Sequence, residues 1–300
     1  MLKSCVRYPK SPFLAGIFFV FAASFPTPSG TVLAAGDSPS AKGAGNQDTT
    51  LPSGIDIGKL DEFERKVFFR VANSESSVCG KGHSLLVSAK NDPSCRKSFY
   101  ALRYVAKLVD SGYTDSEITE KLERRYRLGK QTIDISTAPS KGNPGARLSI
   151  VEFVDYECPH CRLAQELLRQ AMEAYPNDVK VYFKHYPLSS HTNARIAAEA
   201  ATAAHKQGKF WAYNDKVWAV SDILSPAALD KIAKEVGLDM AKFRADKEGD
   251  DIKHRVQKDR DEGHALGINS TPTIYLNGRK YADHLEFVNL KDWIDEELER

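Results

Sequence analysis

Excess charge of either sign is missing from this 300-residue sequence. Lysine and arginine total 42 and aspartate and glutamate total 40, which leaves a formal net charge of +2 at pH 7. Proteins that bind nucleic acids or anionic membrane surfaces present clustered positive charge to phosphate groups. We therefore expect neither nucleic acid nor an anionic membrane surface as a partner. The length and the ordinary apolar content leave room for one large domain or two modest ones.

Long apolar runs are also missing, except near the N-terminus. There, three basic residues precede an uncharged stretch, Phe13–Phe25, which is too short to span a bilayer comfortably. Prolines and then small residues at positions 32–35 follow it and offer a cleavage site. We predict a signal peptide over residues 1–35 and a periplasmic or secreted protein, with an uncleaved N-terminal anchor as the alternative. Removing these residues would change the net charge from +2 to −1, because three basic groups and no acidic ones are lost.

Cysteine is scarce, with five residues in the whole chain. Loss of the signal peptide would remove Cys5 and leave an even number, Cys79, Cys95, Cys158 and Cys161, in an exported protein. A zinc site needs about four ligands, and no second ligand pair lies at a suitable spacing. We therefore expect no metal and no cofactor other than a redox-active disulfide between Cys158 and Cys161.

The arrangement around Cys158 and Cys161 is typical of a redox centre. The apolar run 148–154 predicts a buried strand before them, and apolar residues at helical spacing over 163–174 predict a helix after them. Pro159 suits the first helical position, so Cys158 would be the N-cap residue and Cys161 would lie one turn in. The helix dipole and His160 would stabilise a Cys158 thiolate, because such settings lower a thiol pKa from about 8.5 to between about 3.5 and 7.5. A structural disulfide, a zinc site and a merely exposed His160 are the alternatives.

Two motifs in this half of the chain are similar to one family. Val154-Asp155-Tyr156-Glu157-Cys158-Pro159-His160-Cys161 resembles the active site of the DsbA-like branch of the thioredoxin superfamily, and the segment 267–278 resembles its cis-proline loop and following strand. The resemblance covers about Ala146 to Leu298. It implies an α/β thioredoxin fold with an inserted helical subdomain at about residues 190–265. It also implies that Cys158 exchanges with substrate, that Cys161 resolves the mixed disulfide, and that Thr271 and Pro272 bind substrate.

Two further segments of this half predict local structure. The charged run that ends at Glu262 is most simply a solvated helix face, and Asn277-Gly278 predicts a hairpin turn between two short strands.

Glu152 is the one charged residue in the otherwise apolar strand before Cys158. Burial raises a carboxyl pKa, and such a group can accept the proton of Cys161 during catalysis. The resembled family has a buried acid at this position. The alternative is a glutamate at the strand edge that faces water.

The N-terminal half of the sequence predicts a helical domain that precedes the thioredoxin fold. Composition indicates a flexible linker over residues 36–54, a small all-helical domain over 55–135, a second linker over 136–146, and the thioredoxin-fold domain over 147–300. Within the helical domain, the helical spacing of Leu60, Phe63, Val67, Phe68 and Val71 predicts one amphipathic helix, and Thr114 with Glu117 predicts a capping box that opens another.

The helical domain weakly resembles that of the cytochrome c maturation protein CcmH, through the loop 78–83 and the segment 112–118. That family has two cysteines in the loop, whereas this chain has only Cys79. We therefore predict a structural Cys79–Cys95 disulfide, with a redox role, or His83 as a metal or haem ligand, as the alternatives.

These observations predict an exported thiol–disulfide oxidoreductase that forms disulfides in unfolded or reduced secreted or periplasmic proteins. A membrane redox partner would recycle it. A disulfide reductase or isomerase, serving for example cytochrome c maturation, and a non-catalytic peptide-binding chaperone are the alternatives. A chaperone would not need both Cys158 and Cys161, and both are present.

Overall fold

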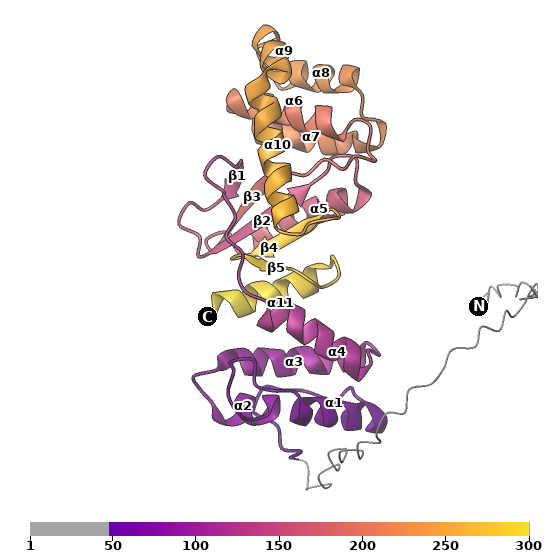
Figure 1. Ribbon diagram of the computed structural model, residues 1–300, viewed down its shortest axis with the longest axis vertical. Helices are drawn as coiled ribbons and strands as arrows, with labels where there is room; N and C mark the ends of the chain where they lie inside the picture. The colour runs from indigo at the N-terminus through magenta and orange to yellow at the C-terminus, as the bar shows by residue number, and fades with distance from the viewer. Residues whose placement is uncertain (1–47, 300) are drawn as a thin grey trace, which may run out of the picture. The chain divides into compact units, whose positions relative to one another are not determined.

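The computed structural model describes residues 48–299, which belong to one compact unit (Figure 1). The predicted signal peptide and the first part of the predicted linker lie outside the described residues. Helices and a five-stranded sheet make up the unit, in agreement with the predicted α/β class. Between residues 48 and 299, every helix is too short or too polar to cross a bilayer.

The first part of the described chain is helical, as the sequence predicts. It consists of α1 (Glu62–Ser74), α2 (Leu85–Asn91), α3 (Arg96–Asp110), α4 (Asp115–Leu122) and a π-helical turn, η1 (Glu123–Arg127). The predicted capping box opens α4, because Thr114 and Glu117 bond to each other's backbone N–H groups. Helix α2 is not predicted by the sequence, and the predicted burial of Phe63 on α1 is wrong, because 71% of this residue is exposed.

The sheet has the strand order β1-β3-β2-β4-β5. Its strands are β1 (Ser140–Gly142), β2 (Leu148–Val154), β3 (Val179–His185), β4 (Thr273–Leu276) and β5 (Arg279–Lys280). The two central strands, β2 and β3, are parallel, and the other pairs are antiparallel. The predicted hairpin turn at Asn277 and Gly278 joins β4 to β5, and both of these residues have a positive φ.

Helices cover both faces of this sheet. On one face, α5 (Pro159–Ala174) and α11 (Phe287–Leu298) enclose a core with alternate residues of β2 and β3. On the other face, α10 (Asp250–Ala265) comes so close that a Cβ atom on Gly263 would lie 2.6 Å from the Tyr186 ring. Only glycine fits at this crossing, so Gly263 sets how closely α10 approaches the sheet.

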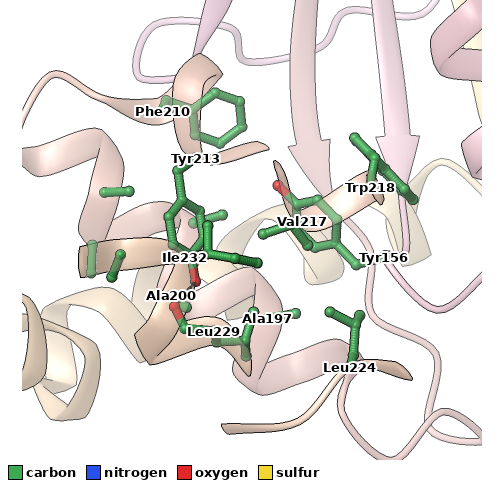
Figure 2. Packing of buried hydrophobic residues seen from close by; sticks show 14 of the residues in the cluster. Tyr156, Ala197, Ala200, Phe210, Tyr213, Val217, Trp218, Leu224, Leu229 and Ile232 are labelled. Atoms are coloured by element: carbon green, nitrogen blue, oxygen red, sulfur yellow. Dashed lines mark hydrogen bonds between the residues drawn. The ribbon is translucent and has the colours of Figure 1, made fainter. Parts of the chain in front are cut away.

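The predicted helical insertion lies between β3 and β4. It contains α6 (Ala194–Lys206), α7 (Phe210–Ala219), a short 3₁₀ turn, η2 (Ser221–Ile223), α8 (Pro226–Glu235), α9 (Met240–Glu248) and α10. Alanines of α6 let the aromatic and aliphatic side chains of α7 and α8 approach closely, and Tyr156 packs against this cluster (Figure 2). The insertion is therefore joined to the segment that carries the cysteines.

One prediction for the insertion is wrong in part. The charged run that ends at Glu262 was interpreted as a solvated helix face, but α10 buries Asp259 completely. Asp259 pairs at 2.7 Å with the fully buried ammonium of Lys184 on β3. Buried charges are retained where they are paired, so this face of α10 is an ionic contact with the sheet.

The two predicted linkers also need correction. Within 136–146, Ser140–Gly142 forms β1 and pairs antiparallel with β3. In the part of 36–54 that the structure describes, Asp48 pairs with Lys90 at 2.6 Å and Leu51 packs against the helical core. Composition indicated flexibility in both segments, but edge pairing and packing against distant residues hold them in place.

The helical region is fixed to the rest of the unit through α11. Arg125 is 3% exposed and pairs with Glu296 at 2.8 Å and with Asp283 at 3.1 Å. Its guanidinium also lies 4.5 Å from the centre of the Trp293 ring. This buried ionic cluster makes the region before residue 128 an integral part of the compact unit.

Candidate active site

The two cysteines lie where β2 ends and α5 begins. Cys158 is the N-cap residue of α5, Pro159 occupies the first helical turn, and Cys161 follows one turn in. Both thiols are free, with 6% of Cys158 and none of Cys161 exposed. Their positions are those that the sequence predicts, and Cys158 is the more accessible of the two sulfur atoms.

The surroundings of Cys158 favour its thiolate. Its pKa is lowered from 9.0 to about 5, first by a hydrogen bond from the Cys161 thiol, and also by the Thr271 side chain and by the backbone N–H groups of Cys161 and His160. Partial burial opposes this shift. The His160 ring is exposed, and among residues 48–299 it has no hydrogen-bond partner. The contribution that can be assigned to His160 is therefore that of its backbone N–H.

The surroundings of Cys161 have the opposite effect. Its pKa is raised well above 9.0, first by burial, then by its hydrogen bond to Cys158 and by the charge of Glu152. The backbone N–H of Asp155, 3.5 Å from Cys161 Sγ, acts in the other direction and lowers this pKa. At neutral pH the arrangement therefore holds one thiolate, on Cys158, and one thiol, on Cys161.

The Thr271–Pro272 peptide bond is cis, and its loop faces Cys158. Cys158 Sγ lies 3.2 Å from the carbonyl oxygen of Thr271 and can donate to it as a thiol. The buried hydroxyl of Thr271 has no other hydrogen-bond partner within the described residues. When Cys158 is a thiolate, this hydroxyl can donate to the sulfur, which explains its effect on the Cys158 pKa.

Glu152 lies on the face of β2 that α5 covers, and it is completely buried. Burial raises its pKa from 4.5 to about 8; a hydrogen bond from Gln165 opposes the shift and the charge of Cys158 adds to it. Gln165 Nε2 donates to one carboxyl oxygen at 2.8 Å, and the other has no partner among residues 48–299. A pKa close to 8 allows this group to give or take a proton near neutral pH.

The three residues before Cys158 connect the cysteine turn to the helical insertion. The Asp155 carboxylate accepts from the Leu188 backbone N–H and from His191 Nδ1, both at 2.8 Å. Tyr156 donates to Asn214 of α7 at 2.9 Å. These contacts are not among those predicted from the sequence, although acids on both sides of Tyr156 in an otherwise apolar segment are a signal for them.

The Glu157 carboxylate forms the third connection, since it accepts from the backbone N–H of Asn193 at 2.7 Å and from its side chain at 3.1 Å. Asn193 is the N-cap residue of α6. Acidic groups are stabilised at helix N-termini, so Glu157 joins the cysteine turn to the start of the insertion.

The other predicted cysteines lie in the helical region. Cys79 and Cys95 form a disulfide with a Cα–Cα distance of 6.1 Å, and it joins the loop before α2 to the start of α3. The nearby His83 is half-buried, and its Nε2 has no hydrogen-bond partner within the described residues. Within residues 48–299, no three His, Cys, Asp or Glu side chains are placed to hold a metal ion.

Comparison with known proteins supports what the geometry indicates. A protein-family model described as Thioredoxin matches residues 135–296, which is more than half of the chain. The probable disulfide bond formation protein D of Bacillus cereus is 30% identical over 187 residues, a match that covers 57% of this chain and 84% of that protein. The chain belongs to the DsbA-like branch of the thioredoxin superfamily. The domain with Cys158 and Cys161 is thus a thiol–disulfide oxidoreductase domain of this superfamily.

Other similarities concern the fold or only part of a longer protein. The oxidised BdbD of Bacillus subtilis superposes with a TM-score of 0.53 at 24% identity, covering 57% of this chain and 98% of that structure. The Na(+)/H(+) antiporter NhaA 3 of Salinispora tropica is 37% identical over 145 residues, or 47% of this chain. This match spans only 22% of the antiporter's length.

Proposed function

We propose that this chain is an exported thiol–disulfide oxidoreductase that acts as an oxidant and forms disulfides in reduced secreted or periplasmic proteins. The observation that supports this direction is the lowered pKa of Cys158, about 5, beside a Cys161 whose pKa is raised. A stable Cys158 thiolate favours the reduced form of the pair. Favouring the reduced form raises the reduction potential, so the oxidised protein readily accepts electrons.

In the proposed reaction, the protein starts with a Cys158–Cys161 disulfide. A substrate thiolate attacks Cys158 Sγ, which forms a mixed disulfide and breaks the Cys158–Cys161 bond, and Cys161 leaves as a thiolate. Glu152, protonated near neutral pH because its pKa is about 8, gives its proton to Cys161. A second substrate thiolate then attacks the substrate sulfur of the mixed disulfide, and Cys158 leaves as its stabilised thiolate.

The cis-proline loop would hold the substrate during this exchange. Thr271 and Pro272 lie against Cys158, so a polypeptide bound along this loop would bring its cysteine to the reactive sulfur. The reaction leaves two electrons on the protein. We propose that a membrane redox partner removes them and that no further cofactor takes part.

Thr271 favours a second candidate, a disulfide reductase or isomerase, which could serve cytochrome c maturation. Reductase and isomerase members of the resembled family also have threonine before the cis-proline. The same exchange steps then run in reverse, with the reduced protein attacking a substrate disulfide through Cys158. The direction depends on which form of the pair the fold stabilises more.

Denaturant unfolding of the oxidised and reduced protein measures that preference directly. We expect the reduced form to be the more stable, since the stabilised thiolate exists only in the reduced fold. We also expect faster oxidation of a reduced, unfolded protein than reduction of insulin. A clearly more stable oxidised form would identify a reductase instead.

The export of the chain is part of the same proposal. A cleaved signal peptide over residues 1–35 would place the cysteine pair in an oxidising compartment. Mass spectrometry of the protein recovered from an expressing bacterium, after separation of periplasm and membranes, distinguishes a cleaved form from an anchored one.

A further inference from the structure

The carboxylate of Asp155 accepts three hydrogen bonds although the residue lies outside the helices and strands. It is 1% exposed, follows β2 and precedes Cys158 by three residues. Its carboxylate accepts from the backbone N–H of Glu157 at 2.7 Å and of Leu188 at 2.8 Å, and from His191 Nδ1 at 2.8 Å. Three donors on one buried carboxylate fix the position of the whole residue.

The backbone of Asp155 in turn contacts the buried cysteine. Its N–H donates to Cys161 Sγ at 3.5 Å and lowers the Cys161 pKa, whereas burial, the Cys158 thiol and Glu152 raise it. This N–H therefore favours the Cys161 thiolate. Cys161 must carry that charge whenever it leaves a disulfide or attacks one.

His191 is the one side chain among the three donors. It lies in the loop between β3 and α6, and 28% of its side chain is exposed. A neutral imidazole that donates through Nδ1 has its second nitrogen, Nε2, unprotonated. Within residues 48–299, no hydrogen-bond partner of Nε2 is present, so the bond to Asp155 is what orients the ring.

We propose that His191 is a positioning residue for the step in which Cys161 gains or uses its negative charge. This inference rests on the proposed function. Through the Asp155 carboxylate, His191 holds the backbone N–H that stabilises the Cys161 thiolate. In the reducing direction, the Cys161 thiol gives its proton to the Glu152 carboxylate and attacks Cys158 Sγ of the mixed disulfide; the protein disulfide forms, the bond to the substrate breaks, and the substrate leaves as a thiolate. In the oxidising direction, the same N–H stabilises Cys161 as the leaving thiolate.

The reaction of the full chain carrying Cys5→Ser, with Cys158 and Cys161 reduced and the Cys79–Cys95 disulfide intact, with an aromatic disulfide, 5,5′-dithiobis(2-nitrobenzoate), separates the two cysteines. Cys158 attacks first and releases one coloured thiolate, and attack by Cys161 on the mixed disulfide then releases the second. For His191→Ala we expect the first phase to stay within about twofold of wild type. We expect the second phase to slow about tenfold, a smaller effect than losing an oxyanion donor outright because the N–H remains in place.

Two variants distinguish positioning from general loss of structure. His191→Asn keeps a donor at the place of Nδ1 and should restore the second phase to within about threefold of wild type. His254→Ala, an exposed histidine of α10, should change neither phase. Equal slowing of both phases in His191→Ala, or no rescue by asparagine, would overturn the role of His191. A wild-type protein that lacks the two-phase reaction would contradict the proposed function itself.

Discussion

At the scale of single residues, a few contacts shift the pKa values of two neighbouring thiols in opposite directions. Cys158 lies at a helix N-terminus and receives donors from Cys161, Thr271 and the backbone, whereas Cys161 is enclosed by apolar side chains next to Glu152. Each thiol also affects the other, because the Cys161 thiol donates to the Cys158 sulfur. Because of this difference in pKa, the Cys158 sulfur can exchange with substrate as a thiolate while Cys161 remains protonated.

The first prediction concerns which sulfur reacts. Brief treatment of the reduced protein with iodoacetamide should label Cys158 and leave Cys161 unlabelled, because the thiolate is the nucleophile. The labelling rate should follow the Cys158 thiolate, rising with pH to half of its maximum near pH 5. Mass mapping of the labelled peptide identifies the site, and Cys158→Ser should abolish the reaction. Preferential labelling of Cys161 would reverse the roles assigned to the two residues.

The second prediction concerns the buried carboxyl of Glu152. Its pKa is about 8 in the folded protein with both thiols free, against 4.5 as the ordinary value, and burial, the first cause, raises it in the oxidised protein as well. Between these values the folded state binds more protons than the unfolded state, so rising pH destabilises the fold. Glu152→Gln removes this penalty. The stability of the variant relative to wild type should increase from pH 5 to pH 8, by about 3 to 4 kcal/mol in total and by at most about 1.4 kcal/mol per pH unit.

Denaturant unfolding of the oxidised proteins at several pH values measures this difference. The oxidised form is required, because the lowered pKa of Cys158 in the reduced form gives a stability term of the opposite sign between about pH 5 and pH 9. Glu248→Gln, at an exposed position, is the control and should show no such trend. A difference that does not change with pH would mean that Glu152 is ionised throughout this range.

At the scale of elements, the helical region is held by a disulfide as well as by its core. Cys79 and Cys95 join the loop before α2 to the first residues of α3, across 16 residues of sequence. Cys95 Sγ also lies 3.1 Å from the buried Ser98 hydroxyl, and the loop itself offers few apolar side chains to pack. The covalent bond therefore replaces packing that the loop lacks.

The third prediction concerns the stability that this disulfide contributes. Replacing both Cys79 and Cys95 by serine should lower the free energy of unfolding by about 3 kcal/mol, the value expected for a closed loop of this length. The two-phase reaction of Cys158 and Cys161 should stay close to wild type at temperatures where the variant is folded. Thermal unfolding and the kinetics are measured on the same samples. Lost reactivity at unchanged stability would instead indicate electron transfer between the two disulfides.

At the scale of the whole compact unit, buried ion pairs fix the helical region to α11. Arg125 is enclosed by the rings of Tyr104 and Trp293 and by two carboxylates. Tyr126 donates to Glu296 at 3.1 Å, and Trp293 donates to Asp283 at 2.7 Å, so both acids have further partners. The connecting segment is also held, because the Gln131 backbone N–H donates to the Gly278 carbonyl at 2.7 Å.

The fourth prediction tests this attachment. Arg125→Met should destabilise the protein by about 3 to 5 kcal/mol, since it removes the buried cation that pairs with both Asp283 and Glu296. Arg124→Ala is the control, because Arg124 is exposed and, within the part of the chain that the structure describes, pairs only with Glu120 one turn earlier. It should cost less than about 1 kcal/mol. Denaturant unfolding measures both variants, and equal effects would mean that the buried cluster does not hold the two regions together.

The sequence alone determined the features that depend on a few neighbouring residues. Pro159 between two cysteines, the apolar strand before them and the helical spacing after them fixed the strand-to-helix turn. The capping box at Thr114 and the turn at Asn277 and Gly278 are likewise local. Such features are encoded within one or two turns of chain, because they arise from backbone preferences and from hydrogen bonds between near neighbours.

Tertiary structure decided the features that join distant segments. The strand pairing of Ser140–Gly142, the burial of Lys184 against Asp259 and the contact of His191 with Asp155 each bring together residues at least 36 positions apart. Locally, these residues resemble a linker, a solvated helix face and an ordinary loop histidine. Their roles arise only when the fold removes water from them and leaves each polar group to a partner that sequence spacing does not reveal.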